Sequence, residues 1–455
     1  MQHLFDELFR APALERIYSD AATVQAMLDF EAALALAAAR AEIIPPPAAS
    51  AIAANCRADL IDLPALTRAA SLSGNLAIPL IKQLTALVAK ENGEAARYVH
   101  WGATSQDVID TAAVLQLREA LAPILGNLGS LADSFAQLAQ THRKTILPAR
   151  TWMQQALPTT FGFIAAGWLD ALLRARERLL ALSKSSLVLQ FGGAVGTLAA
   201  LGERGAQVAK LLAEELRLEF PPIPWHSHRD RFAEAAAVFG LLAGTLAKVA
   251  RDISLHSQTE IAEIHEPSSK GRGGSSTMPH KHNPVACAAI LGATLRVPAL
   301  VSTMLVAMDH PQQRALGSWH AEWETFPEIV RLTAGGLHHL AAIAPHLAVD
   351  TRRMRENLEA TRGLIFTEAV SMVLSEKLGR QAAHERLESA ARRAQSENRH
   401  LRDILAAEKD LSAVLTSPEL DRLFDPLNYL GSAGAFIDRV LAAYRAPQQN
   451  QAAGG

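Results

Sequence analysis

The chain has 455 residues, a formal net charge of −2 and an aromatic content of 5%, a length that suggests two or three domains rather than a single core. A charge balance near zero gives no sign of a nucleic-acid partner or of a polybasic membrane-binding surface. The two cysteines, Cys56 and Cys287, provide no disulfide framework and fit a reducing compartment. Because residues 1–10 carry acidic side chains and lack an unbroken apolar core, we expect no signal peptide and a cytoplasmic protein.

Helical patterns follow one another along the whole chain. Residues 1–109 show short ones, broken by three prolines at 45–47, and one long amphipathic helix over residues 20–42 with Asp20 as the expected N-cap. After Asp110 the apolar residues recur at helical spacing over longer stretches. The predicted long helices cover residues 110–142, 153–185, 229–265, 284–308 and 322–345. Helices of this length pair side by side in bundles, so the sequence predicts an all-α fold.

This pattern divides the chain into three helical domains and a tail. We expect an N-terminal helical domain (1–109), a central helical bundle (110–349), a C-terminal helical domain (350–446) and a disordered tail (447–455). The apolar stretch 290–308 is interrupted by Thr294, Arg296 and Pro298, which favours a buried helix over a membrane span. Residues 192–197, GGAVGT, follow no predicted strand, so we interpret them as a turn rather than a phosphate-binding loop.

The most specific stretch is GRGGSSTMPHKHNPV at residues 271–285. Glycines at 273–274 allow a loop to follow a ligand closely. Ser275 and Ser276 offer hydroxyls, Lys281 a positive charge and Asn283 an amide. Together these groups can hold a carboxylate and stabilise further negative charge that develops on it. A polar surface linker is the alternative for the Gly-Ser part, but the Met-Pro-x-Lys-x-Asn-Pro continuation argues against it.

Residues 271–285 closely resemble the signature loop of the fumarase/aspartase superfamily, which includes fumarase, aspartase, argininosuccinate lyase and adenylosuccinate lyase. The resemblance implies a loop that closes over the substrate, with Ser275 as the group that moves a proton alpha to a carboxylate; Ser276 remains an alternative carrier. It also implies a central bundle of long helices flanked by two small helical domains, and a homotetramer in which each active site is built from three subunits. The superfamily needs no metal and no cofactor.

Residues 98–111, YVHWGATSQDVIDT, place Thr104 and Ser105 just before a predicted long helix. A helix N-terminus favours an anion, but Thr104, Ser105 or Asp107 could equally cap the helix. The stretch resembles the first conserved segment of the superfamily. The resemblance implies that Thr104 and Ser105 bind a substrate carboxylate and that His100 lies in the site and assists catalysis.

Residues 148–160, PARTWMQQALPTT, resemble the second conserved segment but depart from it at one position. Argininosuccinate and adenylosuccinate lyases have a Thr-His pair there, whose histidine protonates the leaving amine. This chain has Thr151-Trp152, with Gln154 as a further candidate contact. An indole has no proton to give at neutral pH, whereas a carboxylate leaving group, with a pKa near 4, needs none. The alternative is a histidine function relocated to another residue such as His100.

The leaving-group argument selects among the reactions of the superfamily. Run in reverse, the loss of a carboxylate is its addition across an alkene, which closes a lactone. The lactone-forming cycloisomerase branch performs this reaction on a carboxylated muconate in the protocatechuate branch of aromatic catabolism. The runner-up is a fumarate-releasing lyase of the adenylosuccinate lyase type, and a third alternative is a catalytically inactive helical scaffold.

A substrate with three carboxylates requires further cations, and residues 224–232, PWHSHRDRF, supply candidates. Arg229 and Arg231 are suited to the task through their planar forks, although a charged stretch at a helix start is often only a solvated face. The pairs His226-x-His228 and His280-x-His282 do not indicate zinc, because no cysteine or carboxylate cluster completes a tetrahedral set. The expected partners are a small tricarboxylate substrate and copies of the chain itself, with no nucleic acid, membrane or metal.

Overall fold

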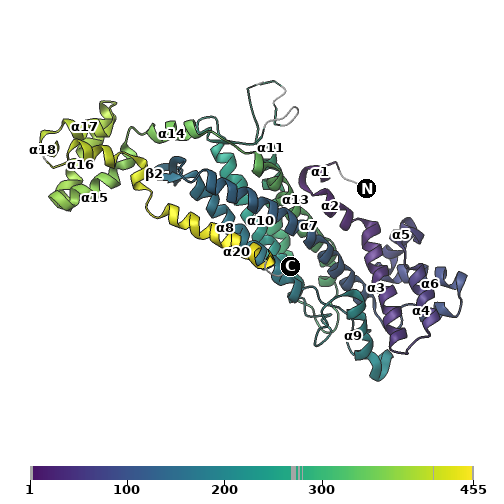
Figure 1. Ribbon diagram of the computed structural model, residues 1–455. Coiled ribbons are helices and arrows are strands. Elements are labelled where there is room, and N and C mark those ends of the chain that lie inside the picture. The colour runs from purple at the N-terminus through teal and green to yellow at the C-terminus, as the bar shows by residue number, and fades with distance from the viewer. Residues whose placement is uncertain (1–3, 268–272, 275–276, 279, 413, 453–455) are drawn as a thin grey trace. The chain divides into compact units, whose positions relative to one another are not determined.

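The computed structural model describes residues 4–267, 273–274, 277–278, 280–412 and 414–452, and helices account for 71% of the chain (Figure 1). The predicted all-α class is confirmed. The chain forms two compact units. Unit 1 comprises Met1–Leu128, Arg174–Ala247 and Ala289–His339, and unit 2 comprises Gly129–Leu173, Lys248–Ala288 and Leu340–Gly455. The unit boundaries fall inside helices, and the expected division into three helical domains and a tail stays a prediction.

Four long helices are α7 (Ser105–Thr141), α8 (Phe161–Ser185), α10 (Asp230–His256) and α13 (Ser318–Ile343). Each lies within or close to a predicted long helix. The predicted helix over 284–308 is instead two helices, α11 (Val285–Thr294) and α12 (Val297–Val306). Pro298 explains the break, because proline lacks an N–H and its ring clashes with the carbonyl four residues earlier, at Thr294.

Unit 1 begins with a series of shorter helices. They are α1 (Asp6–Phe9), α2 (Pro12–Ile17), α3 (Asp20–Arg40), α4 (Pro46–Asn55), α5 (Leu63–Ser73) and α6 (Ala77–Glu91), and α9 (Gly205–Leu216) follows later in the chain. The N-cap of α3 is Ser19, whose hydroxyl accepts the Ala22 N–H at 3.2 Å, so the expected cap Asp20 is off by one residue. Helix α3 contacts α4 and α9, and Figure 1 shows the three helices near one another.

Unit 2 contains the strands, which the sequence analysis did not predict. β1 (Ile146–Thr151) and β2 (Gln154–Thr160) form an antiparallel hairpin, and β3 (Ile264–His265) pairs with β4 (Ala348–Val349). The hairpin occupies the start of the predicted helix 153–185, so that prediction was wrong before Phe161. The alternation of apolar and polar residues that marks a strand is weak over Pro148-Ala149-Arg150. The register between β1 and β2 also shifts there.

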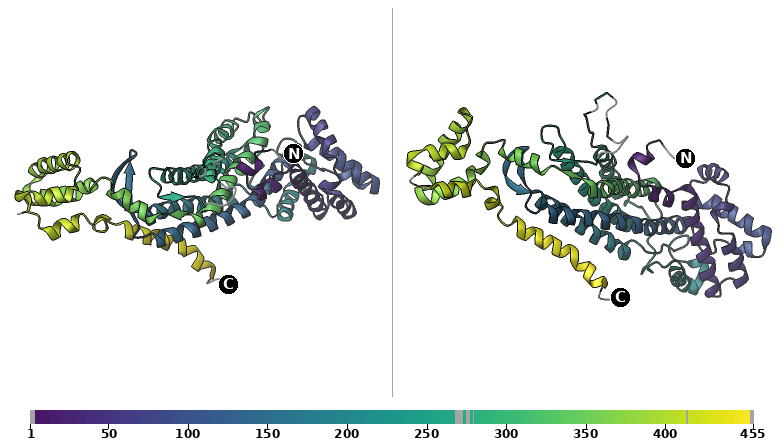
Figure 2. Two further views of the ribbon diagram at one scale, coloured as in Figure 1. Left: turned by 90° about the horizontal axis from the view of Figure 1, so that it is seen from above. Right: turned by 45° about the horizontal axis from the view of Figure 1, so that its top comes forward.

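The rest of unit 2 is helical. Its elements are α14 (Thr351–Glu359), α15 (Thr367–Leu378), α16 (Arg380–Ser396), α17 (Leu401–Ala407), α18 (Lys409–Ser412), α19 (Ser417–Leu423) and α20 (Ala433–Ala452). Helices α15 to α19 share one small apolar core, which includes Val370, Leu387 and Ile404. α20 returns along α7 and α8 (Figures 1 and 2). The ring of Phe436 lies tilted against that of Phe163, with 6.3 Å between the ring centroids. α20 includes residues 447–452 of the stretch expected to be a tail.

Short 3₁₀ turns connect the longer elements. They are η1 (Ala58–Leu60), η2 (Ala95–Tyr98), η3 (Ala199–Arg204), η4 (Ala344–His346), η5 (Leu364–Phe366) and η6 (Pro426–Tyr429). Three helical stretches are long and apolar enough to cross a membrane by length and composition alone, namely Asp20–Arg40, Asp230–His256 and Val285–Val306. The third is divided between α11 and α12.

Candidate active site

In unit 1, Thr104 and Ser105 lie at the N-terminus of α7 and are half-buried. The carboxylate of Asp107, in the first turn of α7, accepts the Thr104 N–H at 3.0 Å. Asp107 is fully buried and also accepts the N–H groups of Gly192 and Gly193, each at 2.9 Å. The glycine-rich stretch 192–197 is therefore a loop that closes on Asp107.

His100 lies in the turn that precedes α7, with a left-handed φ of 60°. Its Nδ1 is 2.7 Å from Oε1 of Glu31, a fully buried carboxylate on α3. Burial by itself lowers the pKa of His100, but the charge and hydrogen bond of Glu31, with a contribution from Asp107, outweigh it and raise that pKa above its ordinary value. His100 is thereby favoured as a cation, which suits a site for carboxylates.

In unit 2, Thr151 and Gln154 are opposite each other at the end of the β1–β2 hairpin, and Trp152 and Met153 form its two-residue turn. Trp152 is 97% exposed and Met153 is 73% exposed. Both have positive φ, 51° and 64°, a conformation that disfavours side chains larger than glycine or asparagine. A large indole held in a strained turn and directed to solvent contributes nothing to the core of unit 2, so a role in binding a ligand or another copy is favoured.

Arg150, the residue before Thr151, anchors the hairpin to a buried carboxylate. Its guanidinium donates to both oxygens of Glu263, at 2.9 and 2.7 Å. Glu263 is fully buried and also accepts from Asn357 Nδ2 at 2.8 Å, and its Oε2 lies 2.6 Å from His256 Nδ1. Burial raises the pKa of Glu263, but these partners outweigh that effect and hold it below its ordinary value. The pairing fixes the hairpin to the segment that leads into the signature loop.

The signature loop is described only in part. Ser275 and Ser276, both predicted site residues, lie outside the described residues. At the base of the loop, Gly274 pairs with His282, and the Asn283 N–H donates to the Gly273 carbonyl at 2.9 Å. Gly273 has φ 69°, and a Cβ there would lie 2.7 Å from the Asn283 carbonyl oxygen. Glycine is required at this position, because the two ends of the loop touch through their backbones.

Two further features belong to the loop. Lys281 is exposed and Asn283 is half-buried, so the predicted cation and amide lie at or near the surface of unit 2. Glu266 precedes the loop in the chain. Its carboxylate accepts the N–H groups of Ala286 and Cys287, which follow the loop at the start of α11, at 3.0 and 2.7 Å. The loop therefore leaves from and returns to anchored backbone.

The prediction that Arg229 binds a substrate carboxylate finds no support in its surroundings. Its side chain is 1% exposed and lies between Asp110 and Glu322, with the closest contact to each at 2.6 and 2.5 Å. Its donors are directed at these two carboxylates, which gives Arg229 a structural role in unit 1. Arg231 is half-buried, and its guanidinium donates to the Ser185 carbonyl.

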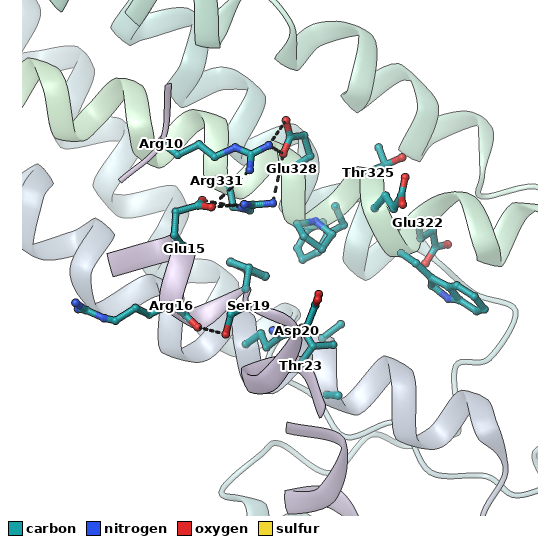
Figure 3. Close-up of a pocket in the computed structure, with 18 of the residues that line it drawn as sticks. Arg10, Glu15, Arg16, Ser19, Asp20, Thr23, Glu322, Thr325, Glu328 and Arg331 are labelled. Atoms are coloured by element: carbon teal, nitrogen blue, oxygen red, sulfur yellow. Dashed lines mark hydrogen bonds and ion pairs between the residues drawn. The ribbon is translucent and has the colours of Figure 1, made fainter. Parts of the chain in front are cut away.

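A cavity of about 1540 Å³ in unit 1 is not lined by any of the predicted site residues, although Asp110 and Glu322, the partners of Arg229, line it. Figure 3 shows that two of its arginines are paired with carboxylates, Arg10 with Glu328 and Arg331 with Glu15, and further acidic side chains line it. Such a groove is poorly suited to a substrate with three negative charges. Among the residues that the structure describes, no group of three or more His, Cys, Asp and Glu side chains is arranged to hold a metal ion. His226 is instead bound to Asp107 at 2.7 Å.

Several residues of the site region were missed from the sequence. Glu31 and Glu263 are buried carboxylates that hold candidate segments in place, and Asp107, which the sequence indicated only as a possible helix cap, is a third. Glu31 had a visible signal, since it is an acidic residue within a long apolar stretch, FEAALALAAA. Glu263 gave no such signal in the sequence, because its partner Arg150 is 113 positions away.

Comparison with known proteins identifies the class of protein. Residues 8–299 match the family model described as "Lyase", and residues 363–440 match that of the adenylosuccinate lyase C-terminus. The chain belongs to these lyases, the fumarase/aspartase superfamily, which confirms the resemblance found in its three motifs.

Within that family, the chain is similar to the 3-carboxy-cis,cis-muconate cycloisomerases. It is 51% identical to the protein of that name from Bradyrhizobium diazoefficiens, over 96% of this chain and 97% of the relative. Identity to the one from Pseudomonas aeruginosa is 52%, over 97% and 96%. The crystal structure of the 3-carboxy-cis,cis-muconate lactonizing enzyme from Pseudomonas putida is similar with a TM-score of 0.94 and 50% identity, covering 98% of this chain and 99% of that one.

Proposed function

We propose that the chain catalyses the interconversion of 3-carboxy-cis,cis-muconate and a carboxymuconolactone. The observation that carries the proposal is Trp152, exposed at the tip of the hairpin where a fumarate-releasing lyase would present a proton-donating histidine. Near-full-length similarity to cycloisomerases supports the same reaction, and the adenylosuccinate lyase alternative is not favoured.

The ring closes when one carboxylate oxygen attacks the alkene carbon beta to a second carboxylate. The C–O bond forms as the π electrons of the double bond move toward the second carboxylate, which becomes an enediolate with an additional negative charge. Lys281, Asn283 and backbone N–H groups near residues 273–277 stabilise this charge. The leaving group of the reverse step is a carboxylate, so no acid is required at the Trp152 position.

The reaction is completed by a proton delivered to the carbon alpha to the second carboxylate. Ser275 delivers this proton, and Ser276 is the alternative carrier. An alkoxide on serine needs nearby cations to be accessible, and Lys281 and His100 serve this purpose. Because a substrate with three carboxylates becomes a lactone with two, each turnover takes up one proton from solvent.

The substrate carboxylates are bound from several segments. Thr104 and Ser105 hold one carboxylate, with the N-terminus of α7 beside them. On the hairpin, Thr151, Trp152 and Gln154 form a wall of the site, at the tip that Arg150 anchors. Arg231 remains a candidate for a further carboxylate.

Four copies of the chain form the active enzyme, with each site shared between three of them. Apolar surface supports this part of the proposal, because the stretch Val285–Val306 is only 39% buried within the chain. On it, Leu295 is 82% exposed and Val306 is 73% exposed. Helices of this kind gain stability by packing against other copies. A cytoplasmic location is also proposed, supported by the free and buried thiols of Cys56 and Cys287.

The proposal is tested with 3-carboxy-cis,cis-muconate by following loss of its diene absorbance, together with proton uptake in weak buffer. We expect rapid loss of absorbance, one proton taken up per diene lost, and no activity in Ser275→Ala. Adenylosuccinate is run in parallel. Turnover of adenylosuccinate, or no turnover of the muconate by the pure oligomer, would overturn the proposed function.

A further inference from the structure

Glu31 is the acidic side chain that α3 (Asp20–Arg40) buries in its apolar face, beside Phe30 and Leu34. Its Oε1 lies 2.7 Å from His100 Nδ1. Among the described residues, its Oε2 has no hydrogen-bond partner although it is buried. A buried carboxylate with one unsatisfied oxygen is costly to the fold, so its retention calls for a reason beyond packing.

The partner of Glu31 is held in an uncommon backbone conformation. His100 has φ 60°, and the following turn contains Gly102, where a Cβ would lie 2.7 Å from Leu201. The turn leads directly into Thr104 and α7. The backbone conformation and the contact with Glu31 together therefore determine where the imidazole ring lies. His100 is four residues before Thr104, the candidate carboxylate-binding residue.

We propose that Glu31 is a positioning residue for the proposed reaction: it accepts Nδ1–H and holds the His100 ring in one orientation as a cation, so that Nε2–H is presented to the substrate. This inference rests on the proposed function. With Nδ1–H donated to Glu31, the remaining ring nitrogen, Nε2, faces a ligand, and among the described residues no hydrogen bond occupies it. In the cationic ring Nε2–H donates to a carboxylate, and it is also a proton source when each turnover consumes a proton.

The charges around the pair favour this cation. Burial acts against it, but Glu31, together with Asp107, raises the pKa of His100. Cys56, at the end of α4, is a further titratable group that interacts with Glu31, and Asp29 on α3 interacts with Cys56. Burial, with the charges of Glu31 and Asp29, raises the pKa of the Cys56 thiol, so Cys56 stays neutral and does not compete for the proton.

The test is the pH profile of kcat/KM for wild type, Glu31→Gln and His100→Gln. Glutamine keeps the size of Glu31 but removes its charge. We expect the basic limb of the Glu31→Gln profile to move to lower pH. The ratio of wild-type to variant kcat/KM is then small in acid, grows about tenfold for each pH unit between the variant pKa and the wild-type pKa, and is constant above the wild-type pKa. In a double variant, Glu31→Gln adds no further loss to His100→Gln, because Glu31 acts through His100.

Glu328→Gln is the matched control. Glu328 is a partly buried carboxylate of unit 1, paired with Arg10 and Arg296, and it lies outside residues 98–111. Its loss of charge is expected to leave the basic limb in place. A Glu31→Gln profile that is lowered equally at every pH, or a fully additive double variant, would reduce Glu31 to a structural residue and overturn the inference.

A second measurement depends neither on the substrate nor on the folding of Glu31→Gln. The imidazole of His100 is titrated by NMR in the wild-type oligomer labelled with ¹³C at histidine Cε1, with His100→Gln used for assignment. We expect a pKa above the ordinary value; a pKa at or below it would overturn the inference. If the muconate is not turned over but His100 titrates high, the proposed function fails while the Glu31–His100 coupling stands.

Discussion

The guanidinium of Arg229 lies between Asp110 and Glu322, and 1% of its side chain is exposed. Its Cζ also lies over the ring of Trp225, 5.0 Å from the ring centroid. Its attraction to the two carboxylates outweighs the cost of burial and keeps its pKa above the ordinary value. A cation that is fully paired inside unit 1 stabilises the fold and does not attract a substrate.

We therefore expect Arg229→Ala to destabilise the protein by about 3–5 kcal/mol, because two buried carboxylates lose their partner. The measurement is urea unfolding followed by circular dichroism. Arg231→Ala, which removes a half-buried guanidinium two residues later, is the control and is expected to change stability far less. If Arg229→Ala folds normally and instead raises KM, the side chain binds substrate after all.

Glu263 predicts how stability depends on pH. Burial raises its pKa, but His256, Arg150 and Asn357 outweigh burial and lower it below the ordinary 4.5. A pKa that is depressed only in the folded state contributes stability above the unfolded value and loses it as pH falls through the folded value. We expect Tm to fall on acidification below about pH 4.5, and Glu263→Gln to have a lower Tm at pH 7 and a flatter curve in acid.

Calorimetry between pH 3 and 7 checks this expectation. Asp438→Asn is the control from the same unit, since the Asp438–Arg143 pair is largely exposed on the carboxylate side and exposed pairs contribute little. Parallel Tm curves for wild type and Glu263→Gln would mean that Glu263 does not control the acid sensitivity of unit 2.

At the scale of elements, the base of the signature loop contains two glycines, Gly273 and Gly274, and its backbone geometry requires glycine only at Gly273. Gly273 has φ 69° and its Cβ position is 2.7 Å from the Asn283 carbonyl oxygen, whereas Gly274 has nothing within 4 Å of its Cβ position. We expect Gly273→Ala to cost about 1–2 kcal/mol in backbone strain and to lower kcat at least tenfold, because the loop can no longer close at its base.

Gly274→Ala is the matched neighbour and is expected to keep activity within about threefold. Steady-state kinetics of both variants, with melting curves to confirm folding, make the comparison. Equal losses of kcat in the two variants would contradict a specific requirement for glycine at Gly273, because any added methyl group in the loop would then have the same effect.

At the scale of the whole molecule, the proposed sharing of sites between subunits makes a distinctive prediction. Ser275→Ala and Thr104→Ala each remove one component of the site, and we expect each homo-oligomer to be nearly inactive. Mixed oligomers contain some sites with neither substitution, so activity reappears when the two are co-refolded. The check is the activity of the mixture, with light scattering to give the mass of the oligomer. An active monomer, or no recovery in oligomers shown to be mixed, would contradict shared sites.

The sequence predicted the architecture better than the individual contacts. The spacing of apolar residues was sufficient to predict the long helices, because it depends only on which residues of one helix are buried. It missed the hairpin, since its turn is Trp152-Met153 rather than the Asn-Gly that marks such turns. The role of Arg229 was also hidden, because Asp110 and Glu322 lie 119 and 93 positions away. The motif residues Thr104, Thr151 and Lys281 were found because their family pattern is local; their roles remain predictions.

The turn at the tip of the hairpin also sets a limit on how thermostable this chain can become. Replacing Trp152-Met153 by Asn-Gly would remove two side chains from positive φ, a gain of about 1–2 kcal/mol per residue, and would withdraw two large apolar groups from water. Selection for heat resistance alone would therefore favour Asn-Gly. Under the proposed role of Trp152 in the site, the stability that the protein forgoes at these two positions measures how strongly turnover constrains the hairpin.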